Sequence, residues 1–263
     1  MKLAVQEGLV PGASFAERAA RAEDLGFEGI EVAGPTVVDR VGEIKAGLKG
    51  RRIKASTICA GYPGALVTSD PAVRRACRAG IVDRLRAAAE LEVVGLIVVP
   101  VFNDLRNIPD LSPYKSSREL GESLLIAQLQ EMAPQIEKLG GPCILLEALN
   151  RYEADFLTRQ EKAAELARQV NSPAVQVMCD LFHMNIEETD TPAALRKVGK
   201  LCRHVHLADN TRLEPGTGVI DFKAAFAALK AIGFDGYMAL ECGLSGDAET
   251  ALKNAVAYLH SCM

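Results

Sequence analysis

Four residues that can bind a metal ion each end a short run of aliphatic and β-branched residues in the second half of the chain. Glu147 ends the run Cys-Ile-Leu-Leu-Glu and Glu241 ends Tyr-Met-Ala-Leu-Glu, while Asp180 and His206 end two further runs. Three carboxylates and one imidazole suit a hard or borderline divalent cation, whereas a structural zinc site would be rich in thiolates. The residue types therefore predict one divalent ion, with Mn²⁺ preferred and Mg²⁺ or Co²⁺ as alternatives.

The number of these residues matters more than any one of them. A single Asp or Glu at a strand end commonly caps a helix or faces water. Four on neighbouring strands are harder to explain without a cation, because clustered carboxylates repel one another and are costly to desolvate. Side chains alternate between the faces of a strand, so Glu147 shares a face with Leu145, and His206 shares one with His204. If these faces point inward, the four ligands meet at the mouth of a barrel, and His204 fills the barrel below them.

The elements that must position these residues alternate regularly along the chain. Strands are predicted near residues 2–6, 29–33, 53–59, 95–101, 143–148, 175–180, 204–208 and 237–242. Helices are predicted near residues 14–25, 37–48, 71–92, 118–139, 160–169, 192–201, 222–232 and 248–259. Eight strands, each followed by a helix, favour an α/β fold with a single (β/α)8 TIM-barrel domain over residues 1–263. Long loops at 60–70 and 102–117 are candidates for lids over the site or for plain surface loops.

Composition excludes several other classes of protein. The 263 residues are 49% hydrophobic, which is enough for one sizeable core, and the net charge of -4 offers no basic face for nucleic acid. No apolar run reaches the roughly 18 residues that span a membrane, and the first residues do not resemble a signal peptide. We therefore expect a cytoplasmic protein. The seven cysteines, an odd number without a C-x-x-C pair, argue against a disulfide framework.

Three segments resemble the sugar phosphate isomerase/epimerase superfamily, whose fold is the xylose isomerase-like TIM barrel. They are Leu-Glu-Ala-Leu-Asn-Arg-Tyr-Glu at 146–153, Asp-Leu-Phe-His-Met-Asn-Ile-Glu-Glu at 180–188 and His-Val-His-Leu-Ala-Asp-Asn-Thr-Arg at 204–212. The likeness is strongest to ketose 3-epimerases of the D-tagatose 3-epimerase and D-psicose 3-epimerase type. It covers residues 143 to 241 well and is only architectural before them.

The resemblance implies an activity that agrees with the residue types. Glu147, Asp180, His206 and Glu241 would bind one divalent ion, and Glu147 and Glu241 would also be the catalytic acid/base pair. They would move a proton beside the carbonyl of a keto sugar or related small polyol through a metal-stabilised enediolate. The resemblance thus implies an isomerase of carbohydrate metabolism that acts on a small sugar-like molecule and forms a homodimer or homotetramer.

Substrate contacts are implied for Glu153, His183 and Arg212, which would orient the oxygens around the carbonyl. The chain departs from the epimerases in its pocket, because it has polar Gln6 and Glu7 where they have aromatic residues, and it contains no tryptophan. We therefore expect a more polar pocket. Free ketoses, ketose phosphates, hydroxypyruvate-like acids, inososes and oxidised sugars all stay open as substrates.

Other functions compete with epimerisation. A 1,2-isomerase of hydroxypyruvate or an inosose would use much the same residues, and a lyase would follow enolate formation by β-elimination. A metal-dependent endonuclease on this fold would carry more histidines than the four present here. A sugar-binding protein without activity would be expected to have lost a ligand. The turn Pro-Gly-Thr-Gly at 215–218 could bind a phosphate through free backbone N–H groups or could simply precede a helix.

Overall fold

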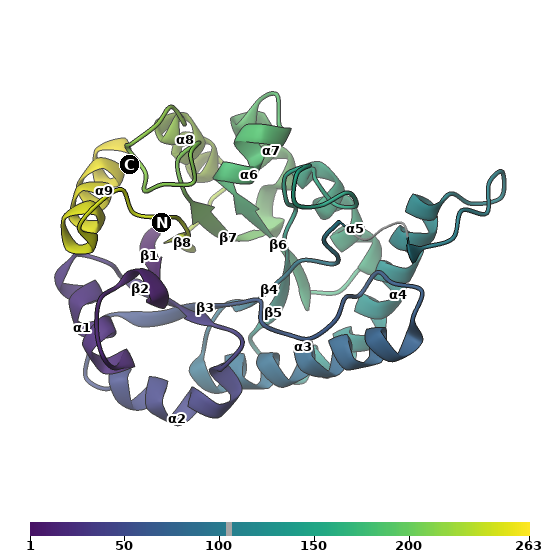
Figure 1. Ribbon diagram of the computed structural model, residues 1–263, viewed down its shortest axis with the longest axis horizontal. Coiled ribbons are helices and arrows are strands. Elements are labelled where there is room, and N and C mark those ends of the chain that lie inside the picture. The colour runs from purple at the N-terminus through teal and green to yellow at the C-terminus, as the bar shows by residue number, and fades with distance from the viewer. Residues whose placement is uncertain (104–106) are drawn as a thin grey trace.

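A closed barrel of eight parallel strands forms the centre of the molecule, with helices around it (Figure 1). The computed structural model describes residues 1–103 and 107–263. The strands pair in chain order, and the first closes against the last. They are β1 (Lys2–Gln6), β2 (Gly29–Ala33), β3 (Lys54–Cys59), β4 (Gly95–Val98), β5 (Cys143–Leu146), β6 (Val175–Asp180), β7 (Cys202–Leu207) and β8 (Tyr237–Leu240). The predicted TIM barrel is confirmed.

The helices follow the strands as the alternating pattern predicts. They are α1 (Phe15–Asp24), α2 (Val37–Leu48), α3 (Pro71–Leu91), α4 (Ser117–Glu137), α5 (Gln160–Val170), α7 (Thr191–Val198), α8 (Phe222–Ala231) and α9 (Ala248–Cys262). The sequence prediction missed α6 (Leu181–Glu187) and the 3-10 turns η1 (Glu7–Leu9) and η3 (Gly199–Leu201). A seven-residue helix that begins directly at a strand end is too short to show a helical period.

Four predicted strands extend too far at their carboxyl ends, the one that corresponds to β7 by a single residue. The ladders of β4, β5 and β8 end at Val98, Leu146 and Leu240, so Glu147 and Glu241 are the first residues beyond their strands. The apolar pattern continues past the ladder because residues such as Ala148 and Val99 are still buried. The apolar pattern of the sequence indicates burial, and at the mouth of the barrel buried residues continue beyond the last residue that pairs with a neighbouring strand.

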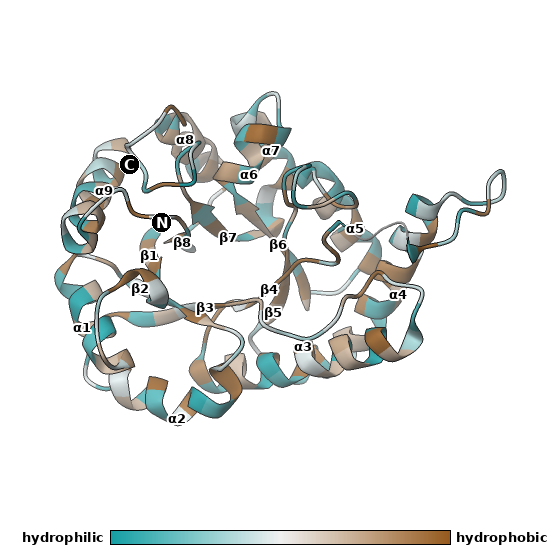
Figure 2. Ribbon diagram, in the orientation of Figure 1, coloured by the Kyte–Doolittle hydropathy of each residue, from teal (hydrophilic) through white to brown (hydrophobic). Residues whose placement is uncertain are grey.

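The core has two parts that differ in polarity. Outward-facing strand residues pack against the helices in one large apolar cluster. Figure 2 shows β4 and β5 as largely hydrophobic, whereas hydrophilic residues recur along the helices. Inside the barrel, Ile97, Leu145 and Met178 form a small separate cluster with Cys143. The next inward-facing positions toward the carboxyl ends of the strands include Glu147 and Asp180. The barrel interior thus changes from apolar to polar toward its mouth.

The two long loops differ from each other. In the loop at 60–70, Leu66 and Val67 are fully buried, and their backbone N–H groups donate to the Pro100 carbonyl at 3.0 and 3.3 Å. This loop is packed against the loop that follows β4. In the loop at 102–117, the residues from 107 onward project beside α4 (Figure 1), and Leu111 and Lys115 form an isolated bridge within them. Residues 104–106 of that candidate lid lie outside the described residues.

No helix within residues 1–103 and 107–263 has the length and apolar character needed to cross a membrane.

Candidate metal centre and active site

The four predicted metal ligands come together at the carboxyl ends of β5 to β8. One ligand atom from each of Glu147, Asp180, His206 and Glu241 can be chosen so that all lie within 4.8 Å of one another. Glu147, Asp180 and His206 are buried, and Glu241 is partly exposed. The register of the barrel produces this meeting, because Asp180 pairs with His206 across β6 and β7. This is the end of a TIM barrel at which active sites are built.

The orientation of His206 fits a metal ion. Its Nδ1 atom is buried and has no hydrogen-bond partner within the part of the chain that the structure describes. That nitrogen lies 3.0 Å from Glu241 Oε2 and 3.8 Å from Asp180 Oδ2. A buried nitrogen that faces two carboxylate oxygens is costly without a cation between them. The donor set of three carboxylates and one imidazole also matches a hard or borderline divalent ion.

The electrostatics of the cluster show a strong local negative field. Burial and the neighbouring Glu241 raise the pKa of Glu147 well above its usual range. Burial opposes ionisation of Glu241 as well, but His206 and Arg212 outweigh it and lower the pKa of that carboxyl to about 2. Burial alone would lower the pKa of His206, yet Glu241 and a second carboxylate raise it well above the usual value. The field that favours a proton on His206 would equally attract a metal cation.

The two carboxylate oxygens of Asp180 make different contacts. Its Oδ1 accepts hydrogen bonds from the backbone N–H groups of Phe182 and His183 at 2.7 and 3.1 Å and so caps the N-terminus of α6. Its Oδ2 faces the cluster and accepts a hydrogen bond from Arg212 at 2.9 Å. The cap fixes the carboxylate, and the strand-to-helix turn thereby aims one oxygen at the site.

Arg212 reaches the cluster from the loop after β7. Its guanidinium donates to Asp180 and to Glu241 and lies over the Phe182 ring, with 4.4 Å between Cζ and the ring centroid. Its backbone has φ of 60°, an unusual conformation for a residue with a side chain that is often found at functional sites. One divalent ion and this guanidinium together carry as much positive charge as the three carboxylates carry negative charge.

His183 also faces the cluster and is oriented from behind. The Asn150 side-chain amide lies 2.8 Å from His183 Nδ1 and donates to Glu153 Oε1 at 2.7 Å. The backbone N–H of Asn150 donates to Nδ1 at 3.3 Å, so the proton of the neutral imidazole sits on Nε2, which lies 3.9 Å from Glu147 and 3.7 Å from Asp180. Glu153 itself is exposed at the rim. The structure thus brings His183 and Arg212 beside the predicted ligands and places Glu153 at the edge.

The two glutamates of the Asn-Ile-Glu-Glu segment support loops and do not enter the site. Glu187 is buried and accepts hydrogen bonds from the backbone and side chain of Arg151, at 2.8 and 2.7 Å. Glu188 accepts a hydrogen bond from the backbone N–H of Gln160 at 2.9 Å, at the start of α5. Glu187 therefore connects α6 to the loop that follows Glu147, and Glu188 connects the end of α6 to the start of α5.

Sequence reasoning missed Glu31 and Cys59, which β2 and β3 direct toward the cluster, whereas it singled out Gln6 at the end of β1. Gln6 donates to Glu241 Oε1 at 2.8 Å, and the Cys59 thiol lies 3.6 Å from the same oxygen. Glu31, in the middle of β2, lies 3.0 Å from His206 Nε2. Gln6 thus makes the site more polar, as predicted, but the expectation for Glu7 was wrong. Glu7 turns away to pair with Arg40 and to accept the Ala33 N–H, because a 3-10 turn begins at that residue.

The Pro-Gly-Thr-Gly segment at 215–218 forms a turn before α8 and not a phosphate-binding site. Asp209 accepts hydrogen bonds from the backbone N–H groups of Gly216 and Ile220 at 2.9 and 3.1 Å, and Asn210 accepts one from Val219 at 3.0 Å. A Cβ atom on Gly218 would lie only 2.1 Å from the Asn210 amide oxygen. The protein's own side chains therefore fill the place that a phosphate would need.

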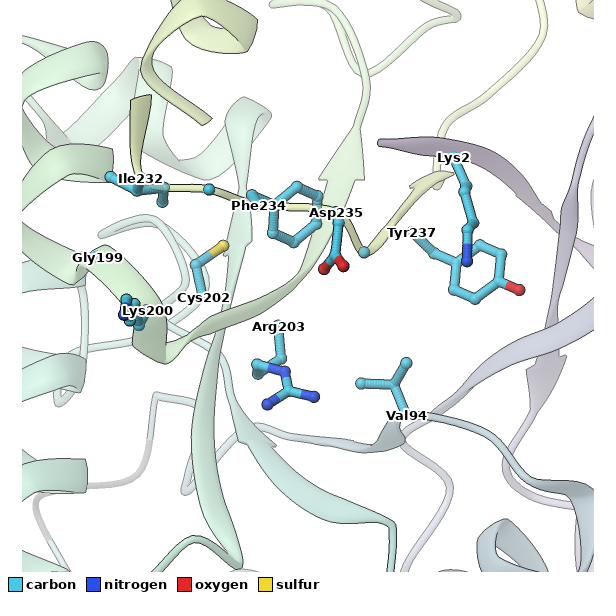
Figure 3. Close-up of a pocket in the computed structure, with 12 residues that line it drawn as sticks. Lys2, Val94, Gly199, Lys200, Cys202, Arg203, Ile232, Phe234, Asp235 and Tyr237 are labelled. Atoms are coloured by element: carbon cyan, nitrogen blue, oxygen red, sulfur yellow. The ribbon is translucent and has the colours of Figure 1, made fainter. Parts of the chain in front are cut away.

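A pocket of about 450 Å³ lies at the opposite end of the barrel (Figure 3). It is bordered by Lys2 and Tyr237, at the first residues of β1 and β8, and by Arg203 near the start of β7. Its charged side chains, which also include Lys200 and Asp235, are exposed to solvent. The active sites of TIM barrels lie at the other end, and the charged side chains around this pocket are exposed, whereas those of the cluster at the mouth are largely buried.

A closed parallel barrel that brings buried carboxylates and histidines together at the carboxyl ends of its strands is typical of a barrel enzyme. The family model described as the xylose isomerase-like TIM barrel matches residues 19–262. The chain belongs to this family.

Relatives of known activity to which this chain is similar include sugar epimerases. The chain is 31% identical over 265 residues to the 3-dehydro-D-guloside 4-epimerase of Escherichia coli, covering all of both chains. It is 30% identical over 228 residues to a D-psicose 3-epimerase of Ruminiclostridium cellulolyticum, covering 82% of this chain and 74% of the relative. A crystal structure of a 3-keto-D-glucoside 4-epimerase from E. coli superposes with a TM-score of 0.89 at 29% identity over all of both chains. The chain is accordingly an isomerase-class enzyme.

Proposed function

We propose that this enzyme is a divalent metal-dependent epimerase that moves a proton beside the carbonyl of a keto sugar, and that its substrate is an oxidised glycoside. The full-length similarity to the 3-dehydro-D-guloside 4-epimerase carries the choice of substrate class. The similarity to a D-psicose 3-epimerase supports the same chemistry. In a 3-keto glycoside, C4 is adjacent to the carbonyl, just as C3 is adjacent to the carbonyl of a 2-ketose. Both inversions therefore need the same removal and return of a proton.

The candidate ligands Glu147, Asp180, His206 and Glu241 would hold one ion, for which Mn²⁺ is our first choice and Mg²⁺ or Co²⁺ the alternatives. A divalent ion held there would withdraw electron density from the substrate oxygens and so acidify the neighbouring C–H bond. The fit rests on the unpartnered Nδ1 of His206 and on the balance of charge with Arg212.

Glu147 and Glu241 are the proposed acid/base pair. They extend from β5 and β8, which are not neighbours in the barrel, so they can approach a bound sugar from different sides. One carboxylate would remove the proton from one face of the substrate, and the other would return a proton to the opposite face. The direction would depend on which epimer is bound.

His183, Arg212 and Glu153 are the proposed substrate contacts. The His183 Nε2–H and the guanidinium of Arg212 are donors beside the cluster and would bind the hydroxyl and carbonyl oxygens. Glu153 at the rim would accept a hydrogen bond from a sugar hydroxyl. The amides near Gly216 are already used by Asp209, which favours a substrate without a phosphate group.

Epimerisation of a free ketose is the second candidate, because the D-psicose 3-epimerase similarity covers most of the chain. A lyase would use the same base but would expel a β-substituent. A 1,2-isomerase of hydroxypyruvate or an inosose would return the proton to a different carbon. We further propose that residues 1–263 act as one cytoplasmic catalytic domain within a homodimer or homotetramer.

Proton exchange in D2O tests the proposal directly. The Mn²⁺-loaded enzyme is incubated with 3-keto glycosides, free ketoses, ketose phosphates, hydroxypyruvate and inososes, and NMR follows deuterium uptake beside the carbonyl. We expect deuterium at C4 of a 3-keto glycoside together with the 4-epimer. Exchange only at C3 of ketoses would mean that the substrate is a free ketose. An unsaturated product would mean that the reaction is an elimination and not an epimerisation. No exchange on any member of the panel would overturn the proposed activity.

A further inference from the structure

Glu31 is a buried carboxylate that the proposed proton transfers do not use. It lies in the middle of β2 between Ile30 and Val32, is 1% exposed, and points across the barrel interior toward β7. Together with His204 and His206 it forms a second group of potential ligand atoms, directly beneath the candidate metal centre. A fully buried carboxylate needs several hydrogen bonds or a cation to be stable.

Four side chains supply those hydrogen bonds. Gln6 Nε2 donates to Glu31 Oε1 at 3.0 Å, and the Thr57 hydroxyl donates to Oε2 at 2.5 Å. His204 Nε2 lies 2.9 Å from Oε2, and His206 Nε2 lies 3.0 and 3.1 Å from the two oxygens. An ionised carboxylate has about four lone-pair positions and no proton to donate. Glu31 therefore acts purely as an acceptor, and both imidazoles must present an N–H at Nε2.

The consequence for His206 is a fixed tautomer. A neutral imidazole with its proton on Nε2 carries its lone pair on Nδ1, which is the nitrogen that faces Glu241 and Asp180. We propose that Glu31 is a positioning residue that holds the Nε2–H form of His206 and thereby directs the Nδ1 lone pair at the divalent ion. Carboxylates in this position typically raise the basicity of a histidine ligand and strengthen metal binding. This inference rests on the metal part of the proposed function.

The same geometry argues against a second metal ion between Glu31 and the histidines. The distances of 2.9 to 3.1 Å between the Nε2 atoms and the Glu31 oxygens are those of direct hydrogen bonds. Gln6 and Thr57 occupy further positions around the carboxylate. We therefore expect one ion per chain, bound by His206 through Nδ1.

The first test does not depend on a Glu31 variant. Nitrogen NMR of the histidine-labelled, Mg²⁺-loaded enzyme reports which ring nitrogen of each histidine carries a proton, and a His204→Gln variant serves only to distinguish the signals of His204 and His206. We expect the proton of His206 on Nε2 and a metal-shifted Nδ1. A proton on Nδ1 would overturn the proposal, whatever any variant does.

The second test measures metal affinity with a matched control. Mn²⁺ titrations, followed by the EPR signal of the free ion, compare the metal-stripped wild type with Glu31→Gln and Glu7→Gln. Glu7, directly after β1, is also a buried, hydrogen-bonded glutamate but is paired with Arg40. We expect Glu31→Gln to weaken Mn²⁺ binding by about 10- to 100-fold and Glu7→Gln to leave it unchanged. A folded Glu31→Gln protein with wild-type affinity would overturn the role of Glu31.

Two further outcomes separate this inference from the proposed function. Binding of two ions by the wild type, with the second lost in Glu31→Gln, would replace the positioning role by a second metal site. Normal Mn²⁺ binding without turnover of any sugar would refute the proposed activity and leave the role of Glu31 standing. If Glu31→Gln does not fold, the NMR measurement on the wild type decides alone.

Discussion

The two halves of the barrel contribute to the site in different ways. The ends of β5 to β8 supply the candidate ligands, two of which are the proposed acid/base pair. β1 to β3 supply Gln6, Glu31 and Thr57, whose polar atoms contact one another and hold those ligands in place. In the proposed function the later half would carry out the chemistry, and the earlier half would set its geometry. Half of the barrel can thus supply every candidate ligand while further contacts to those ligands come from the other half.

Loss of an acid/base carboxylate should have the largest effect on turnover. Glu147→Gln and Glu241→Gln keep the size of the side chain but cannot exchange a proton, so we expect turnover to fall by about 10³-fold. Deuterium exchange on the preferred substrate measures it, and Mn²⁺ titration shows whether metal binding is lost as well. Glu214→Gln is the control, because Glu214 is buried but bonds only to its own loop and to Ser245. A folded acid/base variant within tenfold of the wild type would remove that residue from the pair.

Removal of the divalent ion should abolish activity reversibly and lower stability. The cluster gathers three buried or partly buried carboxylates, and a bound cation relieves their repulsion. At Mn²⁺ concentrations about 100 times the Kd, binding should stabilise the fold by about 2.7 kcal/mol. Thermal unfolding with EDTA and after Mn²⁺ is restored measures this. Identical melting temperatures together with activity that survives EDTA would refute the metal centre.

Substitution of Arg212 should have an intermediate effect that falls mainly on substrate binding. The planar guanidinium bridges Asp180 and Glu241 and stacks on Phe182, which a lysine cannot reproduce. We expect Arg212→Ala to raise KM by about 10- to 100-fold, which corresponds to the loss of one or two charge-assisted hydrogen bonds. Arg212→Lys should recover only part of it. Steady-state kinetics that match the wild type would exclude Arg212 from the site.

Gln6 offers a smaller test of the supporting half. Gln6→Leu removes one neutral donor from Glu241 and one from Glu31. The bond to Glu241 is the one that reaches the proposed acid/base pair, and such a hydrogen bond contributes about 1 kcal/mol, so we expect a loss of about fivefold in kcat/KM with normal folding. A decrease as large as that of Glu241→Gln would mean that the first half takes part in the chemistry itself, and the proposed division of labour would be wrong.

The opposite end of the barrel supplies the smallest expected effect. Lys200 and Arg203 border the pocket of Figure 3 and are exposed. We expect the double substitution Lys200→Ala and Arg203→Ala to leave turnover and Mn²⁺ affinity unchanged. A clear change in either quantity would show that the two ends of the barrel are coupled.

The same division explains how much could be predicted from the sequence. The alternation of strands and helices was clear, and Glu147, Asp180, His206 and Glu241 each end an apolar run, so the structure brings them together as expected. Glu31 gave no comparable signal, because one carboxylate inside a five-residue strand is consistent with an exposed face as well as with a buried one. Its role depends on β7, far away in the sequence, and only the closed barrel shows that contact.

Glu31 was not anticipated from the sequence, whereas Glu7 was anticipated in the pocket and does not lie there. Its position next to Gln6 suggested a second polar group in the pocket. The alternation of a strand would turn neighbours to opposite faces, and here the strand stops at Gln6 and a 3-10 turn begins. Whether a polar residue at a strand end faces the site depends on where the ladder stops, and the hydrophobic pattern does not fix that point to within one residue.

The hydrogen bond between Gln6 and Glu241 joins residues 235 positions apart, at the carboxyl ends of the first and last strands of the barrel. The candidate metal centre is consequently complete only after β8 has paired with β1. Contacts between such distant residues form late, since most of the chain must be ordered before they can be made. The cation would therefore bind to and stabilise only molecules whose barrel has closed. The rate at which a refolding chain gains the ability to bind the cation would then measure the rate of barrel closure.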